Sequence, residues 1–190
     1  MTGQVLGAAG RSLVDAKWAK NSKVAEIGRK AEEHTGRTLI ELAQTGPTIL
    51  NDLRIPIPGF QANIDHVVVF GNQILLIDTK YWRTSFYWTV AGRTRRGLQL
   101  FPEGDKKTLN AAHEGVNRYL RSSGIADFQI VNSLLVVWSK GKPSLALYRP
   151  HMARAVQGRS LLGKLKRITK GQRARADITL ALSTLLNPED

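Results

Sequence analysis

The stretch from Gln61 to Trp82, QANIDHVVVFGNQILLIDTKYW, constrains the fold of this chain more than any other. Two apolar and β-branched runs, 62–70 and 73–81, flank the dipeptide Gly71-Asn72. Glycine reaches the positive φ angle that a two-residue hairpin turn requires, so the pattern predicts an antiparallel hairpin. The middle of each run is continuously apolar, which is typical of strands buried on both faces.

A two-residue turn also fixes the register of the two strands. Phe70 then pairs with Gln73, and counting outward places Asp65 directly opposite Asp78. Side chains alternate along a strand, so Lys80 lies on the same face as Asp78. Like charges on directly opposed residues destabilise a sheet, and we therefore expect a divalent cation to offset them.

Asp65, Asp78 and Lys80 together predict a site for phosphodiester hydrolysis. Carboxylate oxygens are ligands for Mg²⁺ or Mn²⁺, and an adjacent ammonium group can orient or deprotonate a water and stabilise developing negative charge. The alternative is a solvated ion pair of Asp78 with Lys80 at the end of an apolar strand. Charges are costly next to strands buried on both faces, which favours the site.

A helix upstream of the hairpin supplies a further acid. Its pattern starts at Ser22, a candidate N-cap, and stops at Gly46-Pro47. At about 100° per residue, Glu32 lies on the border of the apolar stripe whereas Glu33 points to solvent. Glu32 is therefore the candidate, against the alternative of a boundary glutamate turned outward. Asp52, near the end of a predicted strand, ranks below Asp65 as a competing acid.

The central motifs resemble those of a known group of nucleases. Asp65, followed by Asp78-Thr79-Lys80 after an apolar strand, resembles the PD-(D/E)xK signature. The phrases NIDH at 63–66 and LIDTKYW at 76–82 resemble the nuclease-related domain (NERD) family in particular.

The predicted helix extends this resemblance. The sequence GRKAE at 28–32 is similar to the Gly-x-x-Gly-Glu element on the first helix of nuclease-related domains, with Ala31 in place of the second glycine. The resemblance covers roughly residues 28–138, and it indicates Glu32 as the acid on that helix.

The predicted fold class is α/β, with a mixed central sheet that contains an antiparallel hairpin and is flanked by helices. The resemblance implies a restriction-endonuclease-like core and metal-dependent hydrolysis of DNA. In that reading, Asp65, Asp78, the carbonyl of Thr79 and Glu32 would bind Mg²⁺ or Mn²⁺. Lys80 would position the attacking water.

The length of 190 residues, with 42% hydrophobic content, suits one domain. We expect residues 1–21 to form a partly disordered N-terminal extension, 22–157 a nuclease-like core, and 158–190 basic C-terminal helices packed on the same domain. The lack of cysteine excludes disulfides and thiolate zinc sites. Without a membrane-length apolar run or a signal-like N-terminus, a cytoplasmic protein is the expectation.

The remaining pattern gives shorter elements. We expect β runs at 84–91 and 97–101 joined by an arginine-rich loop, a helix at 105–121 capped by Asp105, a buried strand at 128–138, an edge strand at 151–157, and a closing helix at 178–186. An apolar strand after a helix predicts a β-α-β crossover onto the same sheet.

The charge balance points to a polyanionic partner. The chain carries 28 Lys and Arg against 15 Asp and Glu, a net charge of +13, which favours nucleic acid first and an anionic membrane second. The candidate contacts are Arg83, Arg93, Arg95, Arg96, Lys164 and Arg167. Aromatic residues interleave with the first of these arginines and could stack on bases. The alternative is aromatics in the core and basic side chains that are simply solvated.

Two other functions stay open at this point. A nuclease fold can act as a non-catalytic nucleic-acid-binding module, and paired carboxylates also suit a retaining glycosidase. Lys80 and the net positive charge disfavour the glycosidase. DNA is the expected substrate, RNA is the alternative, and the sequence decides neither strandedness nor whether two copies pair as a homodimer.

Overall fold

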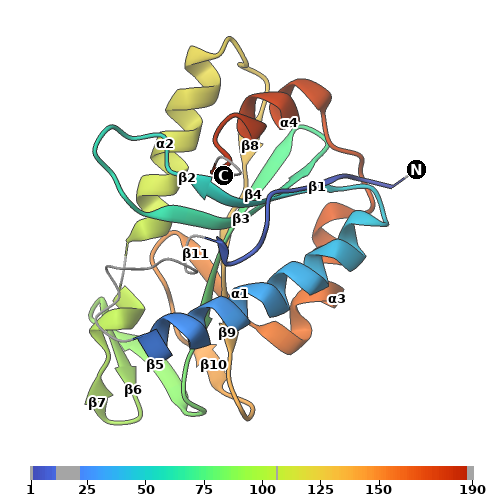
Figure 1. Cartoon of the computed structure of the whole chain (residues 1–190). Helices are drawn as coiled ribbons and strands as arrows, with labels where there is room; N and C mark the ends of the chain where they lie inside the picture. Colours follow the sequence, from blue (N-terminus) through green and yellow to red (C-terminus); the bar gives the residue numbers. More distant parts are fainter. Residues whose placement is uncertain (1, 12–21, 106, 188–190) are drawn as a thin grey trace.

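The computed structural model describes residues 2–11, 22–105 and 107–187. Its architecture is α/β, with a mixed sheet between two helical layers and a smaller sheet at one end of the molecule (Figure 1). The predicted fold class is thereby confirmed. None of the helices in this described part of the chain combines the length and apolar character needed to cross a bilayer.

The main sheet has seven strands in the order β1-β2-β3-β4-β9-β11, with β8 beside β4. Their bounds are β1 (Val5–Leu6), β2 (Thr48–Arg54), β3 (Asn63–Phe70), β4 (Gln73–Tyr81), β8 (Gln129–Ile130), β9 (Ser133–Trp138) and β11 (Ala153–Gln157). Strands β2, β3 and β4 are antiparallel, whereas β9 is parallel to β4 and β11 is parallel to β9. The chain passes through a helix between β4 and β9, so the predicted crossover is confirmed.

The hairpin forms with the predicted turn and register. Gly71 has a φ angle of 54°, which a residue with a side chain adopts only at a cost. Phe70 pairs with Gln73, and the ladder continues to His66 opposite Ile77. Both strands are buried along most of their length because each face of the sheet is covered.

Two helices cover each face of the sheet. α1 (Ser22–Ala43) and α3 (Leu161–Thr169) pack on Val68, Leu75 and Ile77. α2 (Thr108–Ser122) and α4 (Ala176–Ser183) pack on the intervening side chains of the same strands, among them Val67 and Leu76. Alternate residues of the hairpin therefore belong to two separate cores, which explains its continuously apolar sequence.

The smaller sheet was predicted only in part, as the β runs at 84–91 and 97–101, each of which contains one of its strands. Its order is β10-β5-β6-β7, with β5 (Phe86–Val90), β6 (Arg93–Arg96), β7 (Gln99–Leu100) and β10 (Ser144–Leu147). The arginine-rich segment is thus a strand and not the predicted loop, because it pairs with β5 on one side and β7 on the other. Trp82, Tyr87, Phe101 and Tyr148 form the core beneath this sheet.

Several predicted boundaries were wrong. The predicted strand at 128–138 is broken into β8 and β9. Strand β1, which lies in the predicted N-terminal extension and pairs with β2, was missed. Asp105 does not cap α2. It ends a short 3-10 helix, Pro102–Asp105, and its carboxylate accepts a hydrogen bond from the Thr94 N–H at 2.9 Å. A second 3-10 turn, Gly158–Ser160, precedes α3.

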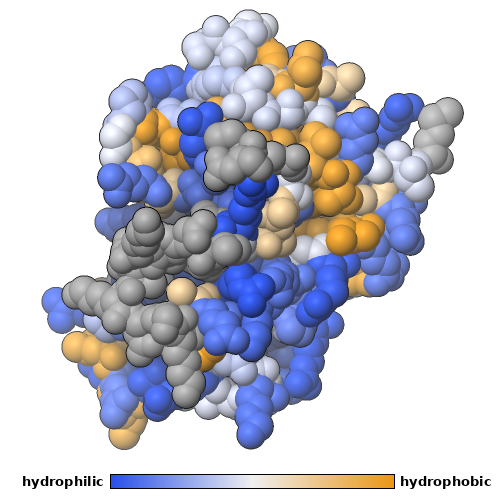
Figure 2. All heavy atoms as spheres, viewed as in Figure 1, coloured by the Kyte–Doolittle hydropathy of each residue, from blue (hydrophilic) through white to orange (hydrophobic). Residues whose placement is uncertain are grey.

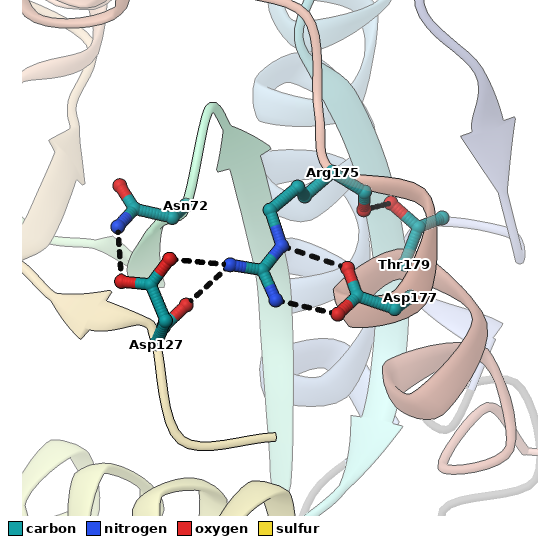
Figure 3. Close-up of polar contacts among 5 residues, drawn as sticks. All are labelled: Asn72, Asp127, Arg175, Asp177 and Thr179. Carbon is teal, nitrogen blue, oxygen red and sulfur yellow. Dashed lines mark hydrogen bonds and ion pairs between the residues drawn. The ribbon is translucent and has the colours of Figure 1, made fainter.

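The turn of the hairpin is held by the C-terminal segment (Figure 3). The Arg175 guanidinium donates to the Asp127 carboxylate at 2.8 Å and to the Asp177 carboxylate at 2.5 Å. Asn72 donates from its side chain to Asp127 at 3.0 Å, and the Arg175 N–H donates to the Gly71 carbonyl at 3.0 Å. One arginine thus joins the hairpin turn, the segment before β8 and the start of α4.

We expect Arg175→Ala to lower the melting temperature by a few degrees and not more, because the ion pairs are solvent-exposed and screened. Arg175→Lys should lower it similarly, since an ammonium group cannot donate to both carboxylates from one plane. Differential scanning calorimetry measures both, with the exposed Arg118→Ala as the matched control. A melting temperature equal to that of the parent in both variants would contradict this role.

Candidate active site

The site begins where the two hairpin strands separate. The β3–β4 ladder ends at His66 and Ile77, and beyond that point β4 pairs on its other side with β9. The start of β3 pairs with β2, as in Arg54 opposite Asn63. This separation, which we call the fork, leaves backbone groups of β4 without a partner on β3.

Asp65 lies at the fork and satisfies one of those groups. Its Oδ2 atom accepts a hydrogen bond of 2.6 Å from the N–H of Thr79. The β3–β4 ladder stops at His66 and Ile77, one residue short of the direct pair predicted between Asp65 and Asp78, so that part of the prediction was wrong. A carboxylate replaces the strand partner here, and this fixes Asp65 beside β4.

Asp78 and Lys80 lie on the same face of β4, as predicted. Lys80 Nζ is 2.6 Å from Asp78 Oδ2 and donates to the Thr79 carbonyl at 3.2 Å. Asp78 is 8% exposed, so this is not a solvated ion pair at a strand end. The ammonium group contacts the two oxygen atoms that the sequence assigns to a metal ion.

Glu32 reaches the site from α1, and it is also 8% exposed. One turn later on α1, the hydroxyl of Thr35 accepts hydrogen bonds from the Thr79 hydroxyl at 3.1 Å and the Trp138 indole N–H at 2.8 Å. These bonds hold α1 against β4 and β9. Glu33 instead forms an ion pair with Arg29 near the surface, in agreement with the predicted difference between the two glutamates.

Asp52 is a fourth acid at the fork, which the sequence ranked too low. On β2, Asn51 pairs with His66 of β3, and Leu53 pairs with Ile64. This register places Asp52 opposite Asp65. The residue is 3% exposed with a φ angle of 56°, and its Oδ1 atom accepts a hydrogen bond of 2.9 Å from the Asn63 amide. The signal for it was a single acid within the apolar strand TILNDL.

Burial and crowding change the acidity of this cluster. Burial, and then the Asp78 carboxylate, raise the pKa of Asp65 to about 7. Burial, and then the Asp65 carboxylate, raise the pKa of Glu32 to about 9. Asp52 adds to both shifts. More carboxyl groups thus meet here than one lysine can pair with, and their mutual repulsion favours the protonated forms of Asp65 and Glu32.

Among the residues that the structure describes, Lys80 supplies the positive charge of this cluster. Burial opposes its charge, yet the Asp78 and Asp65 carboxylates outweigh burial and hold the pKa of Lys80 above its ordinary value. Lys80 is consequently protonated at neutral pH. In the metal-free protein this favours orienting a water and stabilising negative charge over deprotonating a water, the other of the two roles that the sequence left open.

The donor set fits a hard divalent cation in its chemistry. Carboxylates and a backbone carbonyl are the ligands of Mg²⁺ and Mn²⁺, and a cation would offset the repulsion that raises the Asp65 and Glu32 pKa values. Within residues 2–11, 22–105 and 107–187, no group of three or more His, Cys, Asp or Glu side chains is placed to hold a metal ion in this conformation. The Lys80 ammonium contacts the Asp78 and Thr79 oxygens instead.

A small cavity adjoins Asp78 and Lys80. Its volume is about 20 Å³, which is room for roughly one water molecule. Its walls come from β4, the 3-10 helix before α2, and the segment from Tyr148 to Ala153. The Tyr148 hydroxyl donates to the Gly104 carbonyl at 2.7 Å and so joins two of these walls.

Comparison with known families agrees with this geometry. The model of the nuclease-related domain matches residues 27–136, more than half of the chain. The chain belongs to the nuclease-related domain family. No curated protein and no solved structure gives a match. All four acids of the site and Lys80 lie within the matched part of this nuclease-related domain, whereas β10, β11, α3 and α4 lie beyond it.

The candidate nucleic-acid contacts of this nuclease-related domain fall into groups. Arg83 and Arg93 are exposed, Arg95 lies over the Trp88 ring at 5.8 Å, and Arg96 lies over the Phe101 ring at 5.2 Å, against the small core. The other two, Lys164 and Arg167, are on α3. Figure 2 shows hydrophobic residues among hydrophilic ones at the end of the molecule where β6 and β7 lie.

We expect the stability of the metal-free protein to fall as pH rises, and Asp65→Asn to remove part of this fall. Because the pKa of Asp65 is raised from 3.8 to about 7, its stabilisation is complete below the unfolded value and is lost as pH rises through about 7. Each pKa unit corresponds to about 1.4 kcal/mol. Urea unfolding in EDTA should show the variant more stable than the parent at about pH 8 and equal to it at about pH 4.

The exposed Glu114→Gln serves as the control for this experiment, with no change expected at either pH. An Asp65→Asn protein that is no more stable than the parent at the higher pH would show that Asp65 is not held in a strained, crowded state.

Proposed function

We propose that this nuclease-related domain hydrolyses phosphodiester bonds of DNA with the help of Mg²⁺ or Mn²⁺. The observation that carries the proposal is the contact of the Lys80 ammonium with both the Asp78 carboxylate and the Thr79 carbonyl, at the fork where Asp65 is fixed. A cationic group therefore already lies against the two oxygens that would face a divalent ion. The family match supports the same reading.

Each side chain has a role that follows from its position. Asp65, Asp78 and the Thr79 carbonyl would hold the ion, which polarises the phosphate and makes a bound water more acidic. Lys80, protonated at neutral pH, would orient the attacking water and stabilise charge on the phosphate. Glu32 would orient that water from the α1 side or contribute to a second ion.

The outer face of the small sheet supports nucleic acid as the substrate class. Phe86 is 41% exposed, and its ring lies nearly parallel to that of Trp88, with centroids 6.5 Å apart. Arg95 pairs with Trp88 across the sheet, and Arg93 pairs with Val90. Aromatic faces bordered by guanidinium groups stack on bases and hold phosphates. Trp82 and Tyr87, by contrast, are in the core.

A non-catalytic nucleic-acid-binding module is the second candidate. Two observations favour it: the acids form no complete set of ligands among the described residues, and the adjoining cavity holds only about 20 Å³. In that case the Asp78–Lys80 pair would be structural. The cleavage experiment separates the two functions.

We expect the protein to cut plasmid DNA in Mn²⁺ and to be inactive in EDTA. Asp78→Asn should lower the cleavage rate by roughly 100-fold or more, because it removes both a metal ligand and the partner of Lys80. DNA binding in EDTA should be kept or become tighter, since a negative charge near phosphate is lost. Glu114→Gln, an exposed change of the same type, should cut like the parent. An Asp78→Asn protein with full activity would falsify the assignment.

Lys80→Gln gives a result that distinguishes a catalytic lysine from a structural one. Because the Lys80 ammonium contacts the Asp78 and Thr79 oxygens, its removal should strengthen Mn²⁺ binding, by roughly tenfold, while cleavage is lost. Isothermal titration calorimetry measures the affinity. Weaker Mn²⁺ binding in this variant would mean that the ammonium does not compete with the ion for these oxygens.

A further inference from the structure

A second concave site lies outside the fork. A groove of about 930 Å³ runs between β10, β11 and the start of α3. Four basic side chains line it: Lys142, Arg149, Arg154 and Lys164. No aspartate or glutamate is among the residues that line this groove, although the chain has 15 acidic residues in total.

The cations of the groove are not neutralised by the protein. Across the described ranges of the chain, no ion pair links any of the four to a carboxylate. The Arg149 guanidinium donates to two backbone carbonyls, those of Ala146 at 2.6 Å and Tyr148 at 3.2 Å. By contrast, Lys166 on the neighbouring turn of α3 pairs with Glu41 at 3.3 Å.

The basic side chains also lie near one another. Burial lowers the pKa of Lys164, and the positive charges of Arg154 and Arg167 lower it further. Like charges that are held together without a counter-charge repel, and a bound anion relieves this repulsion. The polar side chains of Asn132, Ser144, Gln157 and Ser160 line the same groove and can donate to phosphate oxygens.

The groove adjoins the candidate active site. Tyr148, Pro150 and Ala153 line both the groove and the small cavity that holds Asp78 and Lys80. A nucleic-acid strand with one phosphodiester linkage at Lys80 would therefore continue into the groove. Its four cations come from one strand, the two loops that flank β10, and a helix, which suits successive phosphates better than a single one.

We propose that this groove binds the phosphodiester backbone of the nucleic-acid strand whose scissile linkage lies at Asp78 and Lys80. The proposal rests on the proposed function for the position of the cut, but the binding itself needs no catalysis. All four cations lie beyond residues 27–136, so the groove is built by the part of the chain outside the family match.

The test is fluorescence anisotropy of a labelled DNA oligonucleotide, single-stranded and as a duplex, in EDTA at several salt concentrations. Arg154→Ala with Lys164→Ala should weaken binding by roughly tenfold or more, and it should reduce the slope of log affinity against log salt by about one to two. Arg118→Ala with Arg121→Ala removes the same charge from α2, on the opposite face of the sheet, and should change binding by less than about threefold.

Arg154→Lys with Lys164→Arg keeps the charge and should retain most of the affinity, which separates lost contacts from lost folding. The proposal fails if the groove and α2 double variants bind alike. The proposal also fails if inorganic phosphate competes with the labelled oligonucleotide as strongly as an unlabelled oligonucleotide does at the same total phosphate concentration. The groove would then be a site for a single anion.

Measuring DNA cleavage in Mn²⁺ beside DNA binding in EDTA distinguishes a failure of the groove proposal from a failure of the proposed function. If the parent does not cut DNA but the groove variant binds it more weakly than the α2 variant, the groove is supported and the nuclease assignment fails. If the parent cuts DNA and the groove variant binds it normally, the groove assignment alone fails.

Discussion

The hydrogen bond from the Thr79 N–H to the Asp65 carboxylate is the interaction on which the site depends. Where β3 leaves β4, a buried N–H would lack a partner, at a cost of about 1 to 3 kcal/mol. Asp65 supplies the missing acceptor, and in doing so it places a carboxylate beside Asp78 and Lys80. The acceptor on the Asp65 side chain thus satisfies the backbone where the strands separate, and the same residue places a carboxylate in the site.

The electrostatics of the fork follow from this placement. Asp52, Asp65 and Asp78 come from three neighbouring strands, and Glu32 joins them from the helix that covers the sheet. Lys80 offsets part of this charge, and burial makes the rest expensive. A cluster of this kind makes the folded chain less stable at neutral pH than an uncharged one would be. In the proposed function, a bound divalent cation would offset this repulsion.

The sequence predicted the parts of the site that local patterns determine. The Gly71 turn fixed the hairpin register, and helical periodicity separated Glu32 from Glu33, because both depend on residues close together in the chain. The place where the ladder stops could not be predicted in this way. It depends on β9, which lies more than fifty residues later and pairs with the end of β4.

Strand β6 of the small sheet was missed for a similar reason. Arg93–Arg96 has the composition of a loop, and it becomes a strand because it pairs with β5 and β7 and because Thr94 is buried and bonded to Asp105. That carboxylate was assigned to a helix cap, the role an isolated sequence suggests. Asp52 was ranked low because the following prolines predict a strand end. In the structure the acid is buried before that end is reached.

The packing of α3 and α4 shows that the family match ends before the hydrophobic cores are complete. The region shared with other nuclease-related domains stops at residue 136, within β9. Leu161 and Leu165 of α3 complete one core, however, and Ile178 and Leu182 of α4 complete the other. A fragment that ends with the family's own limit would leave both faces of the central sheet open to water. The family match therefore covers less of the chain than the two hydrophobic cores do, because Val156 of β11 and the leucine and isoleucine side chains of α3 and α4 belong to those cores together with the hairpin.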